Sequence, residues 1–223
     1  MADAVTPDDV DGGEEHQVVE DLPMVGFRHS DRWLYGTMLV SALVGLTAAM
    51  VLSVDAVELA AHPTATLSCD LNAVLSCGTV ARAWQASLLG FPNAFLGLVA
   101  EPVVVTIAVA GLAGVRFPRW FMLSAQLVYL CGLVLAYWLF SQSLLVIGAL
   151  CPWCMLVTVS TTFVFMTFLH VNVRDANLYL PARVQRAAAA GLRTDLDVAV
   201  TAALLATIAL LVVIEHGAAI FGG

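Results

Sequence analysis

The sequence predicts an all-α integral membrane protein that crosses the membrane five times. Its composition is the first reason: 61% of the residues are hydrophobic and 12% are charged, whereas about 25% are charged in an average soluble domain. The second reason is the distribution of apolar residues, which form five runs close to the ~20 residues that a bilayer core requires. These runs lie at residues 33–54, 93–113, 119–142, 145–169 and 198–215.

The basic residues predict the orientation of these runs. All nine are arginines, and the cytosolic loops of membrane proteins are enriched in Lys and Arg. Eight of them fall before the first run, between the second and third, or between the fourth and fifth: Arg28, Arg32, Arg116, Arg119, Arg174, Arg183, Arg186 and Arg193. The exception is Arg82. We therefore expect a multi-pass protein of the plasma membrane or bacterial inner membrane, with its N-terminus in the cytosol.

The chain divides into four segments on this topology. Residues 1–30 form an expected disordered acidic cytosolic tail, because eight of the 17 acidic residues lie within the first 21 positions. Residues 31–170 hold the first four runs and the longest external loop, 55–92. Residues 171–197 form a cytosolic linker whose stretch PARVQRAAAAGL predicts either a short interfacial helix or a loop. Residues 198–223 form the fifth helix and a short external tail.

Four of the five cysteines form two pairs on the predicted outer side, where disulfides persist. Cys69 and Cys77 lie in the external loop, and their spacing does not place them on one helix face, although a flexible loop can close them into a disulfide. Cys151 and Cys154 form a C-x-x-C early in the fourth run, one turn apart on one helix face. Pro152 is tolerated near a helix start, where a thiolate is also favoured. The sequence therefore predicts a helix that begins close to the second pair.

Two dithiols on one side of a membrane suggest electron exchange through mixed disulfides. The loop pair is then the mobile shuttle, and the helical pair is the fixed site that a lipid-soluble electron carrier can reach. An alternative remains open: a non-enzymatic membrane protein, such as a channel or scaffold subunit, with a structural loop disulfide. The cysteine spacing is not a common zinc pattern, so no metal site is expected. Cys131, in the third run, is interpreted as a small buried apolar residue.

Several motifs occur in a specific order along the first four runs. They are CDLNAVLSC in the external loop, Trp84 soon after it, PNAFLGL opening the second run and CPWC opening the fourth. In this order the sequence resembles the vitamin K epoxide reductase family, in its bacterial form, over about residues 30–170. Another quinone-linked thiol oxidase family, DsbB, has its C-x-x-C in the first external loop, which argues against that assignment.

The resemblance implies a bundle of four transmembrane helices around a quinone, with a fifth peripheral helix. It implies a thiol:quinone oxidoreductase that sustains disulfide formation and takes electrons in trans from an extracytoplasmic, DsbA-like thioredoxin-fold protein. Electrons then pass through the loop pair and the helical pair to menaquinone or ubiquinone. In this scheme Cys69 is exposed to the partner, Cys77 exchanges with Cys151, and Cys154 contacts the quinone ring. Membrane lipid is the other expected partner, and no nucleic acid is expected.

The resemblance also suggests residues that hold the quinone. Asn93 stands where the family places an amide near a quinone carbonyl. Thr158 replaces a tyrosine found in many animal members; it can still donate a hydrogen bond, but over a shorter reach. Ala83 stands where the family often has Ser or Thr. Both departures favour quinone reduction over epoxide reduction. Glu101 lies inside the second run, where an ionisable group is costly, so we expect either a proton carrier to the quinone or a protonated acid hydrogen-bonded in the bundle.

Overall fold

A computed structural model describes residues 24, 26–72 and 74–221 of the chain, and their side chains as far as residue 217. Every regular element in this part of the chain is a helix, and five helices are long and apolar enough to cross a membrane. The elements are η1 (Phe27–His29), α2 (Asp31–Ala61), α3 (Cys77–Arg82), η2 (Trp84–Ser87), α4 (Ala94–Leu112), α5 (Arg119–Gln142), η3 (Ser143–Ile147), α6 (Pro152–Arg174), α7 (Ala182–Arg193) and α8 (Leu196–Phe221). The predicted all-α membrane class is confirmed.

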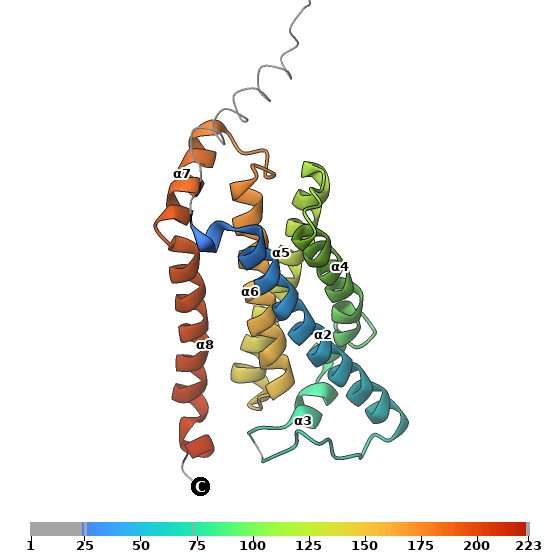
Figure 1. Cartoon of the computed structure of the whole chain (residues 1–223). Helices are drawn as coiled ribbons and strands as arrows, with labels where there is room; N and C mark the ends of the chain where they lie inside the picture. Colours follow the sequence, from blue (N-terminus) through green and yellow to red (C-terminus); the bar gives the residue numbers. More distant parts are fainter. Residues whose placement is uncertain (1–23, 25, 73, 222–223) are drawn as a thin grey trace, which may run out of the picture.

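Four of the long helices form a bundle, and the fifth stands beside it (Figure 1). Helix α2 packs against α4 and α6, and α6 also packs against α5. Helix α8 contacts α6 and α7, and 11% of its most apolar stretch is buried, against 50% for α6. The predicted arrangement of a four-helix bundle with a peripheral fifth helix is therefore confirmed.

The element boundaries differ from the apolar runs and loops of the sequence analysis in two places, and in a third the structure decides between two alternatives. Helix α2 runs to Ala61, so the first residues of the predicted external loop are helical. The π-helical turn η3 and Gly148, at φ 69°, close the preceding span, so α6 starts at Pro152 rather than at residue 145, where the apolar run begins. This confirms the predicted helix start close to the second cysteine pair. In the linker, α7 adopts the helical alternative, from Ala182 to Arg193. Most of the predicted acidic tail, residues 1–23 and 25, lies outside the described residues, and within the rest of it the turn η1 spans Phe27–His29.

Helices α2 and α4 approach closely at glycines. A Cβ atom on Gly97 would lie 2.6 Å from the Cβ of Ala49, and one on Gly111 would lie 2.5 Å from the Tyr35 ring. Small residues allow transmembrane helices to pack with their backbones close together. Gly97 and Gly111 therefore set the distance between the two helices that form one wall of the bundle.

Substituting Gly97 with alanine is expected to destabilise the bundle by about 1–3 kcal/mol, because the added methyl group overpacks the α2–α4 contact. The measurement is the unfolding temperature in detergent or nanodiscs. Gly36→Ala is the matched control, since a Cβ on this helical glycine meets nothing within 4 Å. If Gly97→Ala leaves the unfolding temperature unchanged, the prediction is wrong, and α2 and α4 can move apart without loss of stability.

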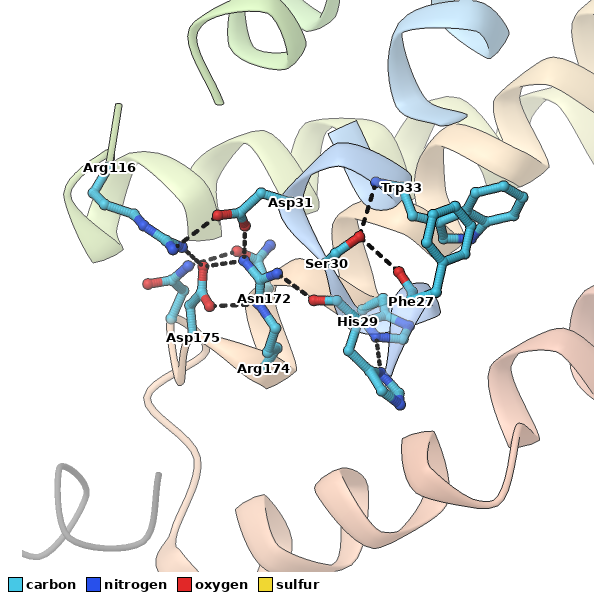
Figure 2. A network of polar contacts seen from close by, with 11 residues as sticks. Phe27, His29, Ser30, Asp31, Trp33, Arg116, Asn172, Arg174 and Asp175 are labelled. Carbon is cyan, nitrogen blue, oxygen red and sulfur yellow. Dashed lines mark hydrogen bonds and ion pairs between the residues drawn. The ribbon is translucent and has the colours of Figure 1, made fainter. Parts of the chain in front are cut away.

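A network of ion pairs joins the helix ends at the opposite end of the bundle from α3 (Figures 1 and 2). Arg174 donates to Asp31 and to Asp175, each at 2.7 Å. Arg116 also bridges these two acids, at 3.1 Å and 2.8 Å. The network thus holds α2, α6 and the α4–α5 connection together.

A second polar chain attaches the fifth helix to the bundle at the same end. Buried His170 on α6 contacts Asp197 on α8 through Nδ1, at 2.7 Å, and His29 through Nε2, at 2.9 Å. Arg28 donates to Asp197 at 2.9 Å and pairs with Asp195. Burial lowers the pKa of His29, and His170 lowers it further. The arginines of both networks therefore lie at one end of the molecule and the cysteine pairs at the other.

Candidate active site

The loop after α2 is folded around the carboxylate of Asp70. This carboxylate accepts hydrogen bonds from the Leu67 and Gly78 N–H groups, at 2.9 Å and 2.8 Å, and from the Ser76 hydroxyl at 2.8 Å. The Gly78 N–H is the main reason why the pKa of Asp70 lies below its ordinary value. A Cβ on Gly78 would come within 2.8 Å of the same carboxylate, so this position has no room for a side chain.

Asp70→Ala is expected to loosen this loop, since hydrogen bonds to a charged group contribute about 1.5–3 kcal/mol each. We expect phosphine reduction of the loop disulfide to become about tenfold faster or more, with Glu58→Ala, on the exposed face of α2, as the control. In the wild type, the stabilisation is present above the ordinary carboxyl pKa and is lost as pH falls through the lowered pKa of Asp70. This role would be contradicted if the rate of disulfide reduction were the same in Asp70→Ala as in the wild type and did not increase at acid pH in the wild type.

The folded loop brings Cys69 and Cys77 together in a disulfide with an S–S distance of 2.05 Å. This confirms that the loop can close the pair. Cys69 is 7% exposed and Cys77 1% exposed, packed in an apolar cluster with Leu59, Leu67 and Cys151. The expectation that Cys69 is exposed to a partner is therefore wrong for this state of the protein, because the apolar cluster covers its sulfur.

A short backbone bridge places the loop disulfide beside the C-x-x-C. The Leu150 N–H donates to the Val74 carbonyl at 2.7 Å, and the Ser76 N–H donates to the Leu150 carbonyl at 3.0 Å. The next residue in each segment is a cysteine, and the Sγ atoms of Cys77 and Cys151 lie 3.4 Å apart. The two sulfurs are therefore in van der Waals contact, close enough for exchange after a small movement.

Cys151 caps the N-terminus of α6. Pro152 occupies the first turn, where its missing N–H costs nothing, and the Cys154 N–H donates to the Cys151 Sγ at 3.3 Å. A hydrogen bond from the Cys154 side chain lowers the pKa of the Cys151 thiol, as do the backbone N–H groups of Cys154 and Trp153, although burial opposes them. This environment favours the thiolate, which is the form that attacks a disulfide.

An apolar cavity of about 490 Å³ begins at these sulfurs and extends into the bundle. Residues of α2, α4, α5 and α6 form its walls, most of them aliphatic. Cys77, Cys151 and Cys154 line it, as do the three predicted quinone-binding residues. Its volume lies in the usual range for small-molecule sites, 300–1,000 Å³. Apolar walls with a few polar groups suit a ligand such as a quinone, whose ring is apolar apart from two carbonyl oxygens.

Asn93 and Thr158 reach the cavity but are already engaged by the backbone. The Asn93 amide donates to the Gln85 carbonyl at 2.6 Å and accepts from the Leu88 N–H at 3.2 Å, which fixes the turn before α4. The Thr158 hydroxyl donates to the Cys154 carbonyl at 3.0 Å. Its single hydrogen is therefore used within α6, and in this state Thr158 can offer a ligand lone pairs alone. Asn93 retains one N–H and one acceptor site.

Glu101 lies deeper in the cavity and is 4% exposed. Its Oε1 would be 2.7 Å from a Cβ on Gly45, so the carboxyl group fits against α2 because position 45 lacks a side chain. Its Oε2 has no hydrogen-bond partner within the described part of the chain. The structure therefore places Glu101 in the cavity with unused bonding capacity.

Tyr129 on α5 is a polar cavity residue that the sequence analysis did not identify. It is 6% exposed, its side chain faces Glu101, and its hydroxyl has no partner in hydrogen-bonding geometry among the described residues. The sequence does contain a signal for it, which is a tyrosine inside an apolar transmembrane run. A buried tyrosine hydroxyl usually has a hydrogen-bond partner, so such a residue indicates a polar group nearby. Glu101 and Tyr129 together form an unsatisfied polar pair at the inner end of the cavity.

Cys131 takes no part in this site. It is a free cysteine on an exposed face of α5, so its interpretation as a buried residue was wrong. Nothing among the described residues packs over its thiol closely enough to bury it. The described residues also contain no group of three or more His, Cys, Asp or Glu side chains suited to a metal ion.

A comparison with protein-family models finds a match over more than half of the chain. The model described as the vitamin K epoxide reductase family matches residues 37–169, which include both cysteine pairs and the cavity walls from α2, α4, α5 and α6. No curated protein sequence matches the chain significantly.

Proposed function

The chain belongs to the vitamin K epoxide reductase family, and we propose that it is a thiol:quinone oxidoreductase that sustains disulfide formation outside the cytosol. The observation that carries this proposal is the 3.4 Å contact between Cys77 of the loop disulfide and the Cys151 thiol, at the mouth of an apolar cavity. A structural loop disulfide in a non-enzymatic protein has no need of a free C-x-x-C thiol against one of its sulfurs.

The proposed electron path runs from a partner dithiol through both cysteine pairs. The partner reduces the Cys69–Cys77 disulfide. The Cys77 thiolate then attacks Cys151 in an oxidised Cys151–Cys154 pair, and Cys154 leaves as a thiolate. Cys69 next attacks Cys77, which restores the loop disulfide and releases Cys151. The described structure, with a loop disulfide and two free thiols, corresponds to the state after this exchange.

The cavity supports a quinone as the final acceptor. Cys154 lines the cavity one helical turn before Thr158 on α6. Its sulfur therefore has direct access to a quinone ring held in the cavity. Ser160, which with Glu101 flanks Gly45, is six residues beyond Cys154, or about 9 Å along the helix. A ring between these levels has the thiol at one end and the Glu101–Tyr129 pair at the other, where the acid and phenol are positioned to donate protons. The quinone supplies the two-electron acceptor chemistry when bound.

The partner is proposed to be a thioredoxin-fold dithiol protein acting in trans. Because Cys69 is buried beneath Leu67 and Leu59 in the oxidised loop, partner attack requires this loop to open. The network around Asp70 is therefore part of the control over access to the disulfide.

The direct test uses the purified chain in lipid nanodiscs with dithiothreitol and a short-chain ubiquinone or menaquinone. We expect dithiol-dependent reduction of at least one quinone, followed by its absorbance change. If neither quinone is reduced while the loop disulfide still resists dithiothreitol, the disulfide is structural and the oxidoreductase assignment fails. The quinone that co-purifies with the protein identifies the natural acceptor.

The proposed orientation makes a separate prediction. A reporter fused after Ala113, near Arg116 and Arg119, is expected to report a cytosolic location, because positive loops face the cytosol. A reporter after Thr64, in the loop that precedes Cys69, is expected to report the outer side. The reverse pattern would place both cysteine pairs in the reducing compartment and would remove the proposed role in disulfide formation.

A further inference from the structure

Asp55 is an acid beside the loop disulfide that the electron path above does not use. It lies on α2, half-buried, and its Oδ2 is 3.9 Å from the Sγ of Cys69. No cation or N–H group pairs with this carboxylate among the described residues. Asp55 thus lies beside one sulfur of the disulfide, that of Cys69, and the Cys151 thiol lies beside the other, that of Cys77.

We propose that Asp55 is the general base that removes the proton from Cys69 during exchange between the two cysteine pairs. This inference rests on the proposed function, since it concerns the step in which the loop disulfide is re-formed. In that step Cys69 is the attacking thiol, and the Asp55 carboxylate, 3.9 Å from its sulfur, is close enough to accept its proton.

Each bond that breaks in this step is matched by one that forms, and the proton stays on a named group. The Cys69 thiol gives its proton to the Asp55 carboxylate, and the Cys69 sulfur attacks the Cys77 sulfur of the Cys77–Cys151 mixed disulfide. The Cys69–Cys77 bond forms, the Cys77–Cys151 bond breaks, and the electron pair leaves on Cys151. The Cys154 N–H, 3.3 Å from the Cys151 sulfur, stabilises this thiolate. Asp55 later returns the proton to Cys69 when a partner dithiol reduces the loop pair.

The neighbouring acids do not compete for this role. Asp70 follows Cys69 in the sequence, but its carboxylate is engaged by Leu67, Ser76 and Gly78. Glu58, one turn beyond Asp55 on α2, is exposed to the surroundings. Asp55 combines contact with the sulfur and a carboxylate free to accept a proton.

The charged groups around Asp55 are few. Asp70 is the nearest charged group in the loop, and the Cys151 and Cys154 thiols are the titratable groups from α6. Arg82 directs its guanidinium to the Pro63 and Ala65 carbonyls. An ordinary free thiol titrates near 8.5, so at neutral pH attack by such a thiol is assisted by a base that removes its proton.

The test follows one reaction of the fully reduced protein in nanodiscs. Four thiols carry electrons for two quinones, so rapid mixing with excess short-chain quinone should give two phases. The first oxidises Cys151 and Cys154, and the second waits for exchange with the loop pair. Asp55→Asn is expected to slow the second phase at least tenfold at pH 7 and leave the first within about twofold. The slowed phase should then accelerate about tenfold per pH unit, as hydroxide replaces the missing base.

Two variants control for structural effects. Glu58→Gln removes the same charge one turn away on α2 and should leave both phases unchanged, whereas Asp55→Glu should restore most of the second phase. An unaltered first phase shows that Asp55→Asn has folded with a competent C-x-x-C. A second phase with wild-type rate and pH profile in Asp55→Asn overturns the inference while the oxidoreductase assignment stands. No quinone reduction by the wild type overturns the assignment itself.

Discussion

Cys151→Ala and Cys154→Ala are each expected to lower dithiol-driven quinone reduction on the order of 10³-fold or more. The expectation follows from their geometry: Cys151 touches the loop disulfide, and Cys154 lines the cavity. A two-electron transfer through a disulfide requires both sulfurs, so the loss of either removes the whole pathway rather than a fraction of it. The measurement is the steady-state rate with a partner dithiol and a short-chain quinone.

Cys131→Ala is the matched control for this experiment. Its thiol lies on an exposed face of α5, outside the cavity, so the rate should be unchanged. Comparable unfolding temperatures for all three variants would show that the loss is chemical. A near-normal rate in Cys151→Ala or Cys154→Ala would mean that electrons reach the quinone by another route.

Cys69→Ala is expected to trap the intermediate between the two pairs. Without Cys69, nothing in the loop can resolve a bond between Cys77 and Cys151, whose sulfurs already lie 3.4 Å apart. A Cys77–Cys151 disulfide should therefore accumulate, and oxidation of a protein partner should be lost. Some reduction of quinone by dithiothreitol should remain, because a small thiol can reach the inner pair directly.

The trapped species can be detected after cleavage of the chain between α4 and α5. Cys77 and Cys151 then lie on different fragments, which stay joined until a reductant is added. The double variant Cys69→Ala/Cys77→Ala cannot form this link and is the control. Normal partner oxidation by Cys69→Ala would show that the loop pair is structural and that the inner pair meets the partner itself.

The parts of this structure that depend on local composition could be predicted from the sequence. Five apolar runs give five spanning helices, and Pro152 after Cys151 indicates a helix start at the dithiol. The ends of these helices were less predictable. The π-helical turn η3 and Gly148 follow α5, so α6 begins several residues later than the fourth apolar run, because hydropathy does not register a left-handed residue.

The geometry of the site depends on contacts between distant segments, which single-sequence patterns do not encode. The bridge between Leu75 and Leu150 aligns Cys77 and Cys151, which are 74 positions apart. The sequence of neither segment indicates that the two segments pair. The burial of Cys69 likewise results from contacts with residues such as Leu59 and Cys151, which come close to it only when the chain folds. Asp55 could not be linked to Cys69 either, since they are 14 residues apart and on different elements.

The stoichiometry of quinone reduction tests the central claim, that electrons pass from the loop pair through Cys151 and Cys154 to a quinone. The fully reduced protein, freed of excess reductant and mixed with a short-chain quinone, should form two quinols per chain. The Cys69→Ala/Cys77→Ala variant should form one. One quinol from the wild type would contradict the account, because the loop pair would then be isolated from the C-x-x-C despite the 3.4 Å contact.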